Sequence, residues 1–152
     1  MTLVELLIVL AIIAIGLAYI IGAFAFYLGI LNTKKNVTYA NALAQQSLEG
    51  VRSVRDNTDW ETDGLGTFLT GIPYHLEQAG SPLHWVLVSG SQTTNGFKQE
   101  IFFDNVYRDS NDNIVASGGV MDPDSKKVRA IISWNQKSKN QQVEIQTILT
   151  NW

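Results

Sequence analysis

Cysteine is absent from the 152-residue chain, and histidine occurs only twice, at His75 and His84. Without cysteine the chain has no disulfide framework and no thiolate metal site. No residue pattern marks a nucleophile–base pair, so we expect a protein that is not an enzyme, needs no cofactor, and carries these histidines as ordinary loop and strand residues. The net charge of −3 gives no general attraction to nucleic acid or to an anionic membrane.

Charge is almost absent from residues 1–33, which hold one of the 14 acidic residues, Glu5, and none of the 11 lysines and arginines. The 26 residues from Leu6 to Leu31 carry no charge. A helix of that length spans about 39 Å, enough to cross a bilayer with some tilt. Its apolar residues fall on every side, which is typical of a helix buried all round in lipid or in protein.

Proline is absent from this run, and glycine occurs at Gly16, Gly22 and Gly29. Each glycine costs a helix interior about 0.8–1 kcal/mol relative to alanine, and their spacing does not make a GxxxG face. Membrane helices tolerate glycine, but these positions also permit the helix to loosen once it leaves the membrane. We expect the segment from Gly16 to Gly22 to be the least regular part of the helix.

Glu5 has no cationic side chain near it in the sequence. An ionisable residue in a membrane-length segment is by default a functional hypothesis whose partner must be named. The only nearby cation is an α-amino group, on the same chain or on another. The alternative is that the carboxylate lies near the helix end and simply reaches the membrane interface.

The stretch Thr2–Leu10, TLVELLIVL, resembles the mature N-terminus of type IV pilins and of the pseudopilins of type II secretion. Met1 stands where the family usually has phenylalanine, and Gly22 where many members have a proline that breaks the helix. The resemblance implies a leader removed by a prepilin peptidase, a methylated N-terminus, storage in the cytoplasmic membrane, and polymerisation by inner-membrane machinery into an extracellular filament on the bacterial surface.

From this resemblance we expect a structural subunit of a type IV pilus, a homo-oligomer in which Glu5 pairs with the N-terminal amine of a neighbouring copy. The expected assembly residues are Met1, Thr2, Glu5, Gly16 and Gly22. A pseudopilin has the same architecture and is the alternative within the family. From a different class, a membrane-anchored binding module that never polymerises also fits the sequence.

The helix is expected to continue past residues 1–31 into an amphipathic half at residues 32–56. Apolar or small residues recur there at spacings of three and four, which makes one stripe: Val37, Ala40, Ala44, Leu48, Val51 and Val54. Asn57 and Asp59 indicate the stop. The whole is predicted to be one helix of more than 50 residues.

Residues 57–152 are predicted to form a loop followed by a four-stranded antiparallel sheet, which gives an α+β fold with the helix packed on the sheet. This arrangement also resembles the pilin globular domain. Residues 57–83 are rich in glycine and contain prolines, so we expect a loop there. The strands are expected at residues 84–90, 97–108, 126–134 and 142–150, with a turn at Asn95–Gly96 and a polar loop at 135–141.

Two segments of opposite charge lie far apart in the sequence. The acidic one comprises Asp56, Asp59, Glu61 and Asp63, and the basic one Lys126, Lys127, Arg129, Lys137 and Lys139. We expect the two to meet on neighbouring copies in a filament, since contacts there are head-to-tail. The basic segment also permits nucleic-acid binding, although lysines that guard a sheet edge are the commoner explanation.

The segment DSNDN has the spacing of calcium-loop ligands at Asp109, Asn111 and Asn113, with Asp122 and Asp124 nearby. Ile114 occupies the position where such loops have glycine, and Val120 the position of the bidentate acid. Turns rich in Asp and Asn are common without metal, so we expect an ordinary turn at this place.

Overall fold

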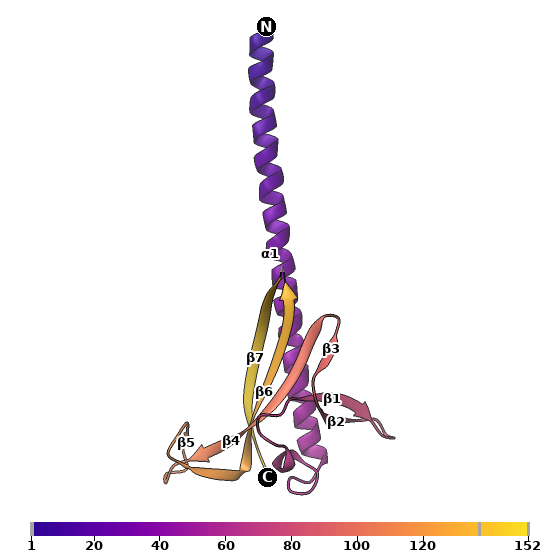
Figure 1. Ribbon diagram of the computed structural model, residues 1–152, viewed down its shortest axis with the longest axis vertical. Helices are drawn as coiled ribbons and strands as arrows, with labels where there is room; N and C mark the ends of the chain where they lie inside the picture. The colour runs from indigo at the N-terminus through magenta and orange to yellow at the C-terminus, as the bar shows by residue number, and fades with distance from the viewer. Residues whose placement is uncertain (1, 137, 152) are drawn as a thin grey trace. The chain divides into compact units, whose positions relative to one another are not determined.

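The computed structural model describes residues 2–136 and 138–151, so the predictions for Met1 and Lys137 lie outside the described residues. The helix α1 (Leu3–Asn57) is followed by the short 3-10 helix η1 (Leu65–Thr67). The described strands are β1 (Tyr74–Ala79), β2 (His84–Ser89), β3 (Gln92–Thr94), β4 (Phe97–Arg108), β5 (Ile114–Val115), β6 (Val120–Gln136) and β7 (Lys139–Thr150) (Figure 1). The predicted α+β class and the single long helix are confirmed.

The chain forms two compact units, Met1–Thr38 and Tyr39–Trp152. The first unit contains the apolar part of α1, and the second contains the C-terminal part of α1 together with the whole sheet.

In the second unit, one stripe of α1 is buried at spacings of three and four. Its members are Ala40, Leu43, Ala44, Ser47, Leu48, Gly50, Val51 and Val54. This confirms the predicted stripe except at Val37, which is 37% exposed. The helix ends where side chains bind its last carbonyl groups: the Asn57 amide donates to Ser53 O and the Thr58 hydroxyl to Val54 O, both at 2.7 Å.

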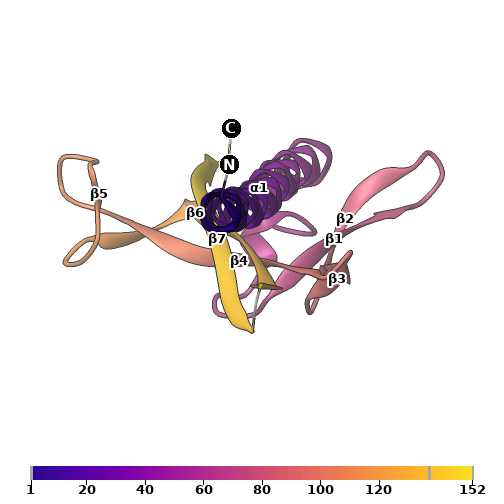
Figure 2. The same cartoon turned by 90° about the horizontal axis from the view of Figure 1, so that it is seen from above.

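The sheet has the strand order β2-β1-β4-β6-β7, with each neighbouring pair antiparallel, and β3 and β5 also pair with β4. Figure 2 shows the β1–β2 hairpin and β5 at opposite ends of this sheet. In β6 the alternation of Val128, Ala130 and Ile132 in the sequence predicts one core-facing side, and all three are fully buried. On β4, Ile101 lies directly opposite Ala130 and is equally buried. These side chains pack in one core with the buried stripe of α1.

Three parts of the strand prediction were wrong. The segment 57–83 contains β1 and η1, and two short strands, β3 and β5, were not foreseen. β1 has few β-branched residues, but it pairs with β2 along its whole length, so tertiary pairing outweighs its weak propensity. The polar loop expected at 135–141 is a tight turn, because β6 runs to Gln136, β7 begins at Lys139, and Ser138 adopts a positive φ of 61°.

Candidate assembly surfaces

The first helical turn is closed by a reciprocal pair of hydrogen bonds between Thr2 and Glu5. The Thr2 N–H donates to Glu5 Oε2 at 2.8 Å, and the Glu5 N–H donates to Thr2 Oγ1 at 3.4 Å. This capping box satisfies two backbone N–H groups that have no partner within the helix. Sequence reasoning missed this role of Glu5, although Thr-x-x-Glu before an apolar run is the signature of the motif.

The capping bond leaves Glu5 able to accept more hydrogen bonds. Its Oε2 atom receives one N–H, whereas an ionised carboxylate offers about four acceptor positions. Glu5 is exposed in the single chain. A second donor can therefore bind Glu5 without opening the cap.

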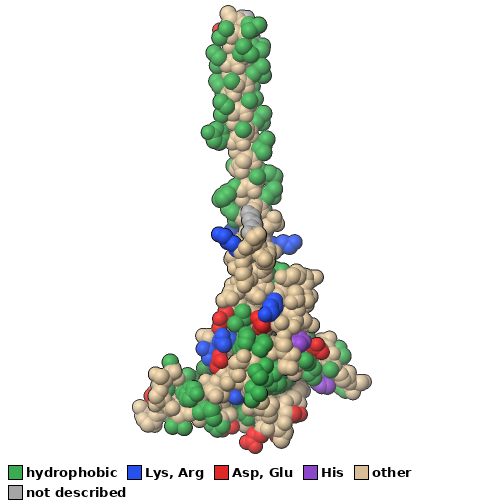
Figure 3. Space-filling model, in the orientation of Figure 1, with side chains coloured by type: hydrophobic (Ala, Val, Ile, Leu, Met, Phe, Trp, Pro, Cys, Tyr) green, Lys and Arg blue, Asp and Glu red, His purple; other side chains and the backbone are tan. Residues whose placement is uncertain are grey.

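The apolar part of α1 exposes its side chains on all sides. Leu3, Tyr19 and Phe26 are 78%, 77% and 72% exposed, and Figure 3 shows hydrophobic side chains covering this segment. In the described part of the chain, α1 is the one helix that is long and apolar enough to cross a membrane. An apolar surface of this size needs a cover of lipid or protein.

The expected irregularity between Gly16 and Gly22 is absent, because α1 is continuous from Leu3 to Asn57. Each glycine weakens the helix by only about 1 kcal/mol, and no proline removes a backbone donor in this segment. The flanking residues therefore keep the hydrogen-bond ladder intact. A Cβ atom at either glycine would meet nothing within 4 Å.

The acidic segment is a turn built by its own carboxylates. Asp59 accepts hydrogen bonds from the N–H groups of Glu61 and Thr62 and from the Thr62 hydroxyl, each at 3.1 Å. The bonds from Thr62 lower the pKa of Asp59. Asp63 accepts the Asp59 N–H at 2.8 Å. The Asp56 carboxylate binds the neighbouring Arg55 at 2.8 Å. Of the four acids in this segment, Glu61 is the one whose carboxylate has no partner within the described residues.

The basic segment does not form one surface, because residues alternate between the two faces of β6. Lys126 binds Asn105 Oδ1 at 3.0 Å, and burial lowers the pKa of its amine. Arg129 donates to Asp104 at 2.6 Å and to Glu144 at 3.4 Å. The Arg129 guanidinium is thus held by carboxylates of its own sheet, and the basic segment does not present all its charges on one face.

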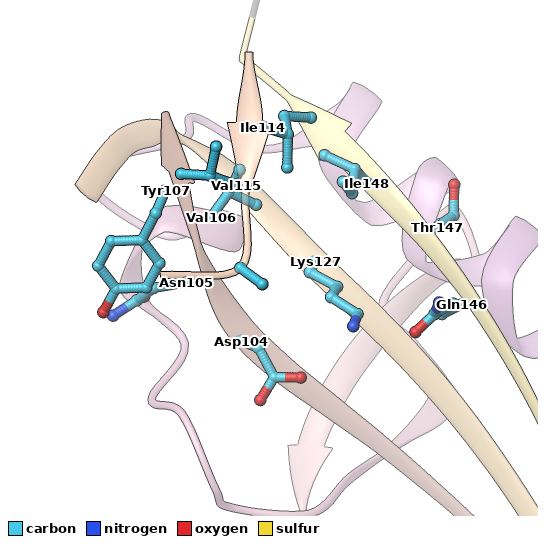
Figure 4. A pocket seen from close by; sticks show the side chains of 11 residues that line it. Asp104, Asn105, Val106, Tyr107, Ile114, Val115, Lys127, Gln146, Thr147 and Ile148 are labelled. Atoms are coloured by element: carbon cyan, nitrogen blue, oxygen red, sulfur yellow. The ribbon is translucent and has the colours of Figure 1, made fainter. Parts of the chain in front are cut away.

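Lys127 lies on the same face of β6 as Arg129, beside a cleft of about 610 Å³ at the end of the sheet. Figure 4 shows Lys127 and Asp104 on neighbouring strands, with apolar side chains of β5 and β7 such as Ile114 and Ile148 beyond them. Asp104 is already held by Arg129. Lys127 and the exposed Lys139 therefore remain as the described basic residues of this segment that form no ion pair or hydrogen bond with another described side chain.

The residues with calcium-loop spacing form an Asx turn. Asp109 accepts the N–H groups of Asn111 and Asn113 at 2.9 Å each and the Asn113 amide at 3.1 Å. The bonds from Asn113 lower the pKa of Asp109. Asp122 binds Arg108 Nε at 2.6 Å, and Asp124 accepts from the amide of Asn151. Within residues 2–136 and 138–151, no three His, Asp or Glu side chains converge as metal ligands.

Both histidines bind groups of their own hairpin. His75, on β1, places Nδ1 3.2 Å from Gly90 O and Nε2 2.9 Å from Glu77 Oε1. His84, at the start of β2, places Nδ1 3.1 Å from Pro82 O. The two rings thus fix the β1–β2 hairpin and the turn inside it.

Comparison of the chain with protein-family models, curated proteins and solved structures finds no match. What the chain does is therefore inferred from its own residues.

Proposed function

We propose that the chain is a structural subunit of the type IV pilin class, which is held in a membrane by its apolar helix and polymerises into an extracellular filament. The observation that carries the proposal is the segment Leu3–Leu31, which is apolar on every side and has a single acid, Glu5, in its first turn. The long helix followed by an antiparallel sheet agrees with the architecture of that class.

Transfer of this helix from lipid into a filament gains little from the hydrophobic effect, because lipid tails are as apolar as the side chains they cover. Packing and polar contacts must therefore select the assembled state. An unpaired acid costs about 2.5–3.5 kcal/mol at the centre of a membrane helix and less near its end. In the filament Glu5 meets the N-terminal amine of a neighbour, which removes this cost only in the correct axial register.

Two substitutions of Glu5 separate its charge from its capping bond. Glu5→Gln keeps an oxygen that accepts the Thr2 N–H but removes the charge, whereas Glu5→Leu removes both. If pairing with the amine drives register, both variants insert into the membrane and both incorporate poorly into filaments. Thr2→Val removes the bond to the Glu5 N–H and keeps the charge, so it shows whether the expected assembly role of Thr2 depends on the cap. Incorporation is measured as pelleted filament from cells that express each variant.

Normal assembly of Glu5→Gln with poor assembly of Glu5→Leu would show that the charge is not needed and that the capping bond is the role of Glu5. Normal assembly of both Glu5 variants would overturn pairing and capping together, and would leave the carboxylate as a group that merely reaches the interface. Mass spectrometry of the mature N-terminus tests processing, for which we expect a methylated residue 1.

The anchored binding module is the second candidate, favoured by the one membrane-length helix of the described residues, which is joined to a folded unit. Electron microscopy distinguishes the filament subunit from the anchored module. When the chain is expressed together with pilus assembly machinery, a subunit forms helical filaments and an anchored module forms none.

A further inference from the structure

One core-facing position of β4 is polar, whereas its neighbours on the same face are apolar. The residues on this side of the strand are Phe97, Gln99, Ile101 and Phe103, and the three apolar ones are buried. Gln99 is only half-buried, and its amide has no hydrogen-bond partner among the described residues. An apolar side chain here would extend the core, whereas the glutamine leaves amide donors and an acceptor available at the surface of the core.

Gln99 lines a groove of about 280 Å³ between α1 and the sheet, within the unit Tyr39–Trp152. We call it the glutamine groove. Its lining residues are Tyr39, Leu43, Gln46, Ser47, Leu76, Trp85, Gln92, Thr94 and Gln99. The helix supplies four of these residues, spaced along one face, and β1, β2, β3 and β4 supply the others.

Three glutamines are among the residues that line this groove. Gln92 lies directly opposite Gln99 in the β3–β4 register, which makes the two side chains neighbours on one face. Gln46 approaches from α1. None of the three amides has a partner among the described residues, and each offers two N–H donors and a carbonyl acceptor.

No Asp, Glu, Lys, Arg or His side chain is among the described residues that line the groove. An ion that entered would lose hydration without finding an opposite charge, which is costly. The lining therefore favours a neutral ligand that both donates and accepts several hydrogen bonds.

Two aromatic side chains complete the groove. Tyr39 is 37% exposed and meets Phe97 edge-on at 4.9 Å between ring centres, while Trp85 packs partly on the core. Aromatic faces carry partial negative charge and attract C–H groups. A pyranose ring presents C–H groups on its faces and hydroxyls around its edge. The aromatic rings of the groove can contact the faces, and the glutamine amides can hydrogen-bond the hydroxyls. Clefts for drug-sized ligands measure about 300–1,000 Å³, so this smaller groove suits a single ring.

We propose that the glutamine groove binds a neutral sugar residue, a hexose or an N-acetylhexosamine of a glycan. The proposal does not depend on polymerisation, because one unit of one chain supplies the entire lining.

The test is a glycan array probed with the full chain in a polyoxyethylene detergent, which has no sugar headgroup to compete. Neutral glycans bind, and the methyl glycoside of the best terminal sugar is then titrated calorimetrically. Gln99→Leu weakens that binding by tenfold or more, whereas its melting temperature stays equal or rises because an apolar residue now faces the core. Gln142→Leu, at an exposed position of β7, is the matched control and binds as the parent does.

Gln46 is an exposed residue of α1, so Gln46→Ala is expected to fold. This variant therefore tests binding even if Gln99→Leu fails to fold. It is expected to weaken binding several-fold. Recognition of acidic glycans alone, or of no glycan, overturns the proposal. So does unchanged affinity in Gln46→Ala and in a folded Gln99→Leu.

Discussion

Several carboxylates of this chain hold the backbone beside them. Glu5 accepts a backbone N–H at the start of α1. Asp59 does so in the turn that follows the end of α1, and Asp109 in the turn that follows β4. Each accepts N–H groups that would otherwise lack a partner. These carboxylates therefore shape the local backbone, and at Glu5 the carboxylate still has acceptor positions for a second donor.

Gly50 allows β1 to approach the helix, because a Cβ at this position would collide with the side chain of Leu76. Gly50→Ala is expected to destabilise the protein by about 1–3 kcal/mol through overpacking, against a gain of up to about 1 kcal/mol in helix propensity. Chemical denaturation measures the free energy of unfolding. Gly22→Ala, on the same helix with open space around it, is the matched control and should cost nothing. Equal effects of the two substitutions would contradict the collision.

The bond between Arg108 and Asp122 predicts a loss of stability in acid. The hydrogen bond from Arg108 holds the pKa of Asp122 below its ordinary value of 3.8. A lowered folded-state pKa stabilises the protein above the ordinary pKa, and this contribution is lost as pH falls through the folded value. The difference in unfolding free energy between the parent and Asp122→Asn should be constant from pH 7 to about 5 and shrink below about 4. If this difference in unfolding free energy stays constant down to pH 2, the Arg108–Asp122 pair is not its source.

At the scale of elements, the two halves of α1 form for different reasons. The second half, from Ala40 to Val54, buries a stripe against the sheet, whereas the first half exposes apolar residues all round. Periodicity predicted the second half and uninterrupted apolarity the first. Neither pattern predicted that the helix continues undisturbed through Gly16 and Gly22.

The continuous helix changes what the glycines are expected to do. Gly16→Ala with Gly22→Ala should leave the helical circular dichroism of the detergent-solubilised subunit unchanged, because both positions are already helical. If the glycines loosen the helix only during assembly, the same variant forms a stiffer filament, measured as a longer persistence length in electron micrographs. An unchanged persistence length would show that the glycines are merely tolerated.

At the scale of the whole molecule, the acidic and basic segments each keep a described charge that is available for contact between copies. The carboxylate of Glu61 and the amine of Lys127 lie in the acidic and basic segments and, in the described part of the chain, form no ion pair. Exposed pairs contribute only about 0–1 kcal/mol each, so such a contact would set register and not supply the main cohesion.

Charge reversal tests this contact. Glu61→Lys and Lys127→Glu should each make filaments more easily dissociated by salt, and the double variant should restore the parent's salt midpoint. Lys139→Glu is the control, because Lys139 lies outside the cleft that Lys127 lines. If the salt midpoint of the double variant is no higher than that of the single variants, residues 61 and 127 are not in contact in the filament. The chain has no cysteine, so paired substitutions to cysteine at 61 and 127 add a crosslinking measurement without background.

The sequence predicted the fold class, the long helix and the core-facing alternation of β6, because each depends on repeated apolar spacing. It did not predict β1, whose pairing with β2 is a tertiary property, or the ion pairs within the basic segment. Arg129 meets Asp104 and Glu144 because the sheet brings these carboxylates from neighbouring strands. The sequence also did not predict that Gln99 faces the core, because the face on which a strand residue lies becomes known only with the register of the strand.

The strand order also governs how quickly the sheet forms. β3–β4 and β6–β7 are hairpins joined by two residues each, and β1–β2 is joined by a short turn. Hairpins close in about 1–10 μs, and sheets made of local contacts fold faster than sheets made of distant ones. The sole registered residue pair between β1 and β4 is Tyr74 with Ile101, and it must await these hairpins, as must the packing of the α1 stripe. We therefore expect the hairpins to form first and the helix to dock last, on a sheet that is already assembled.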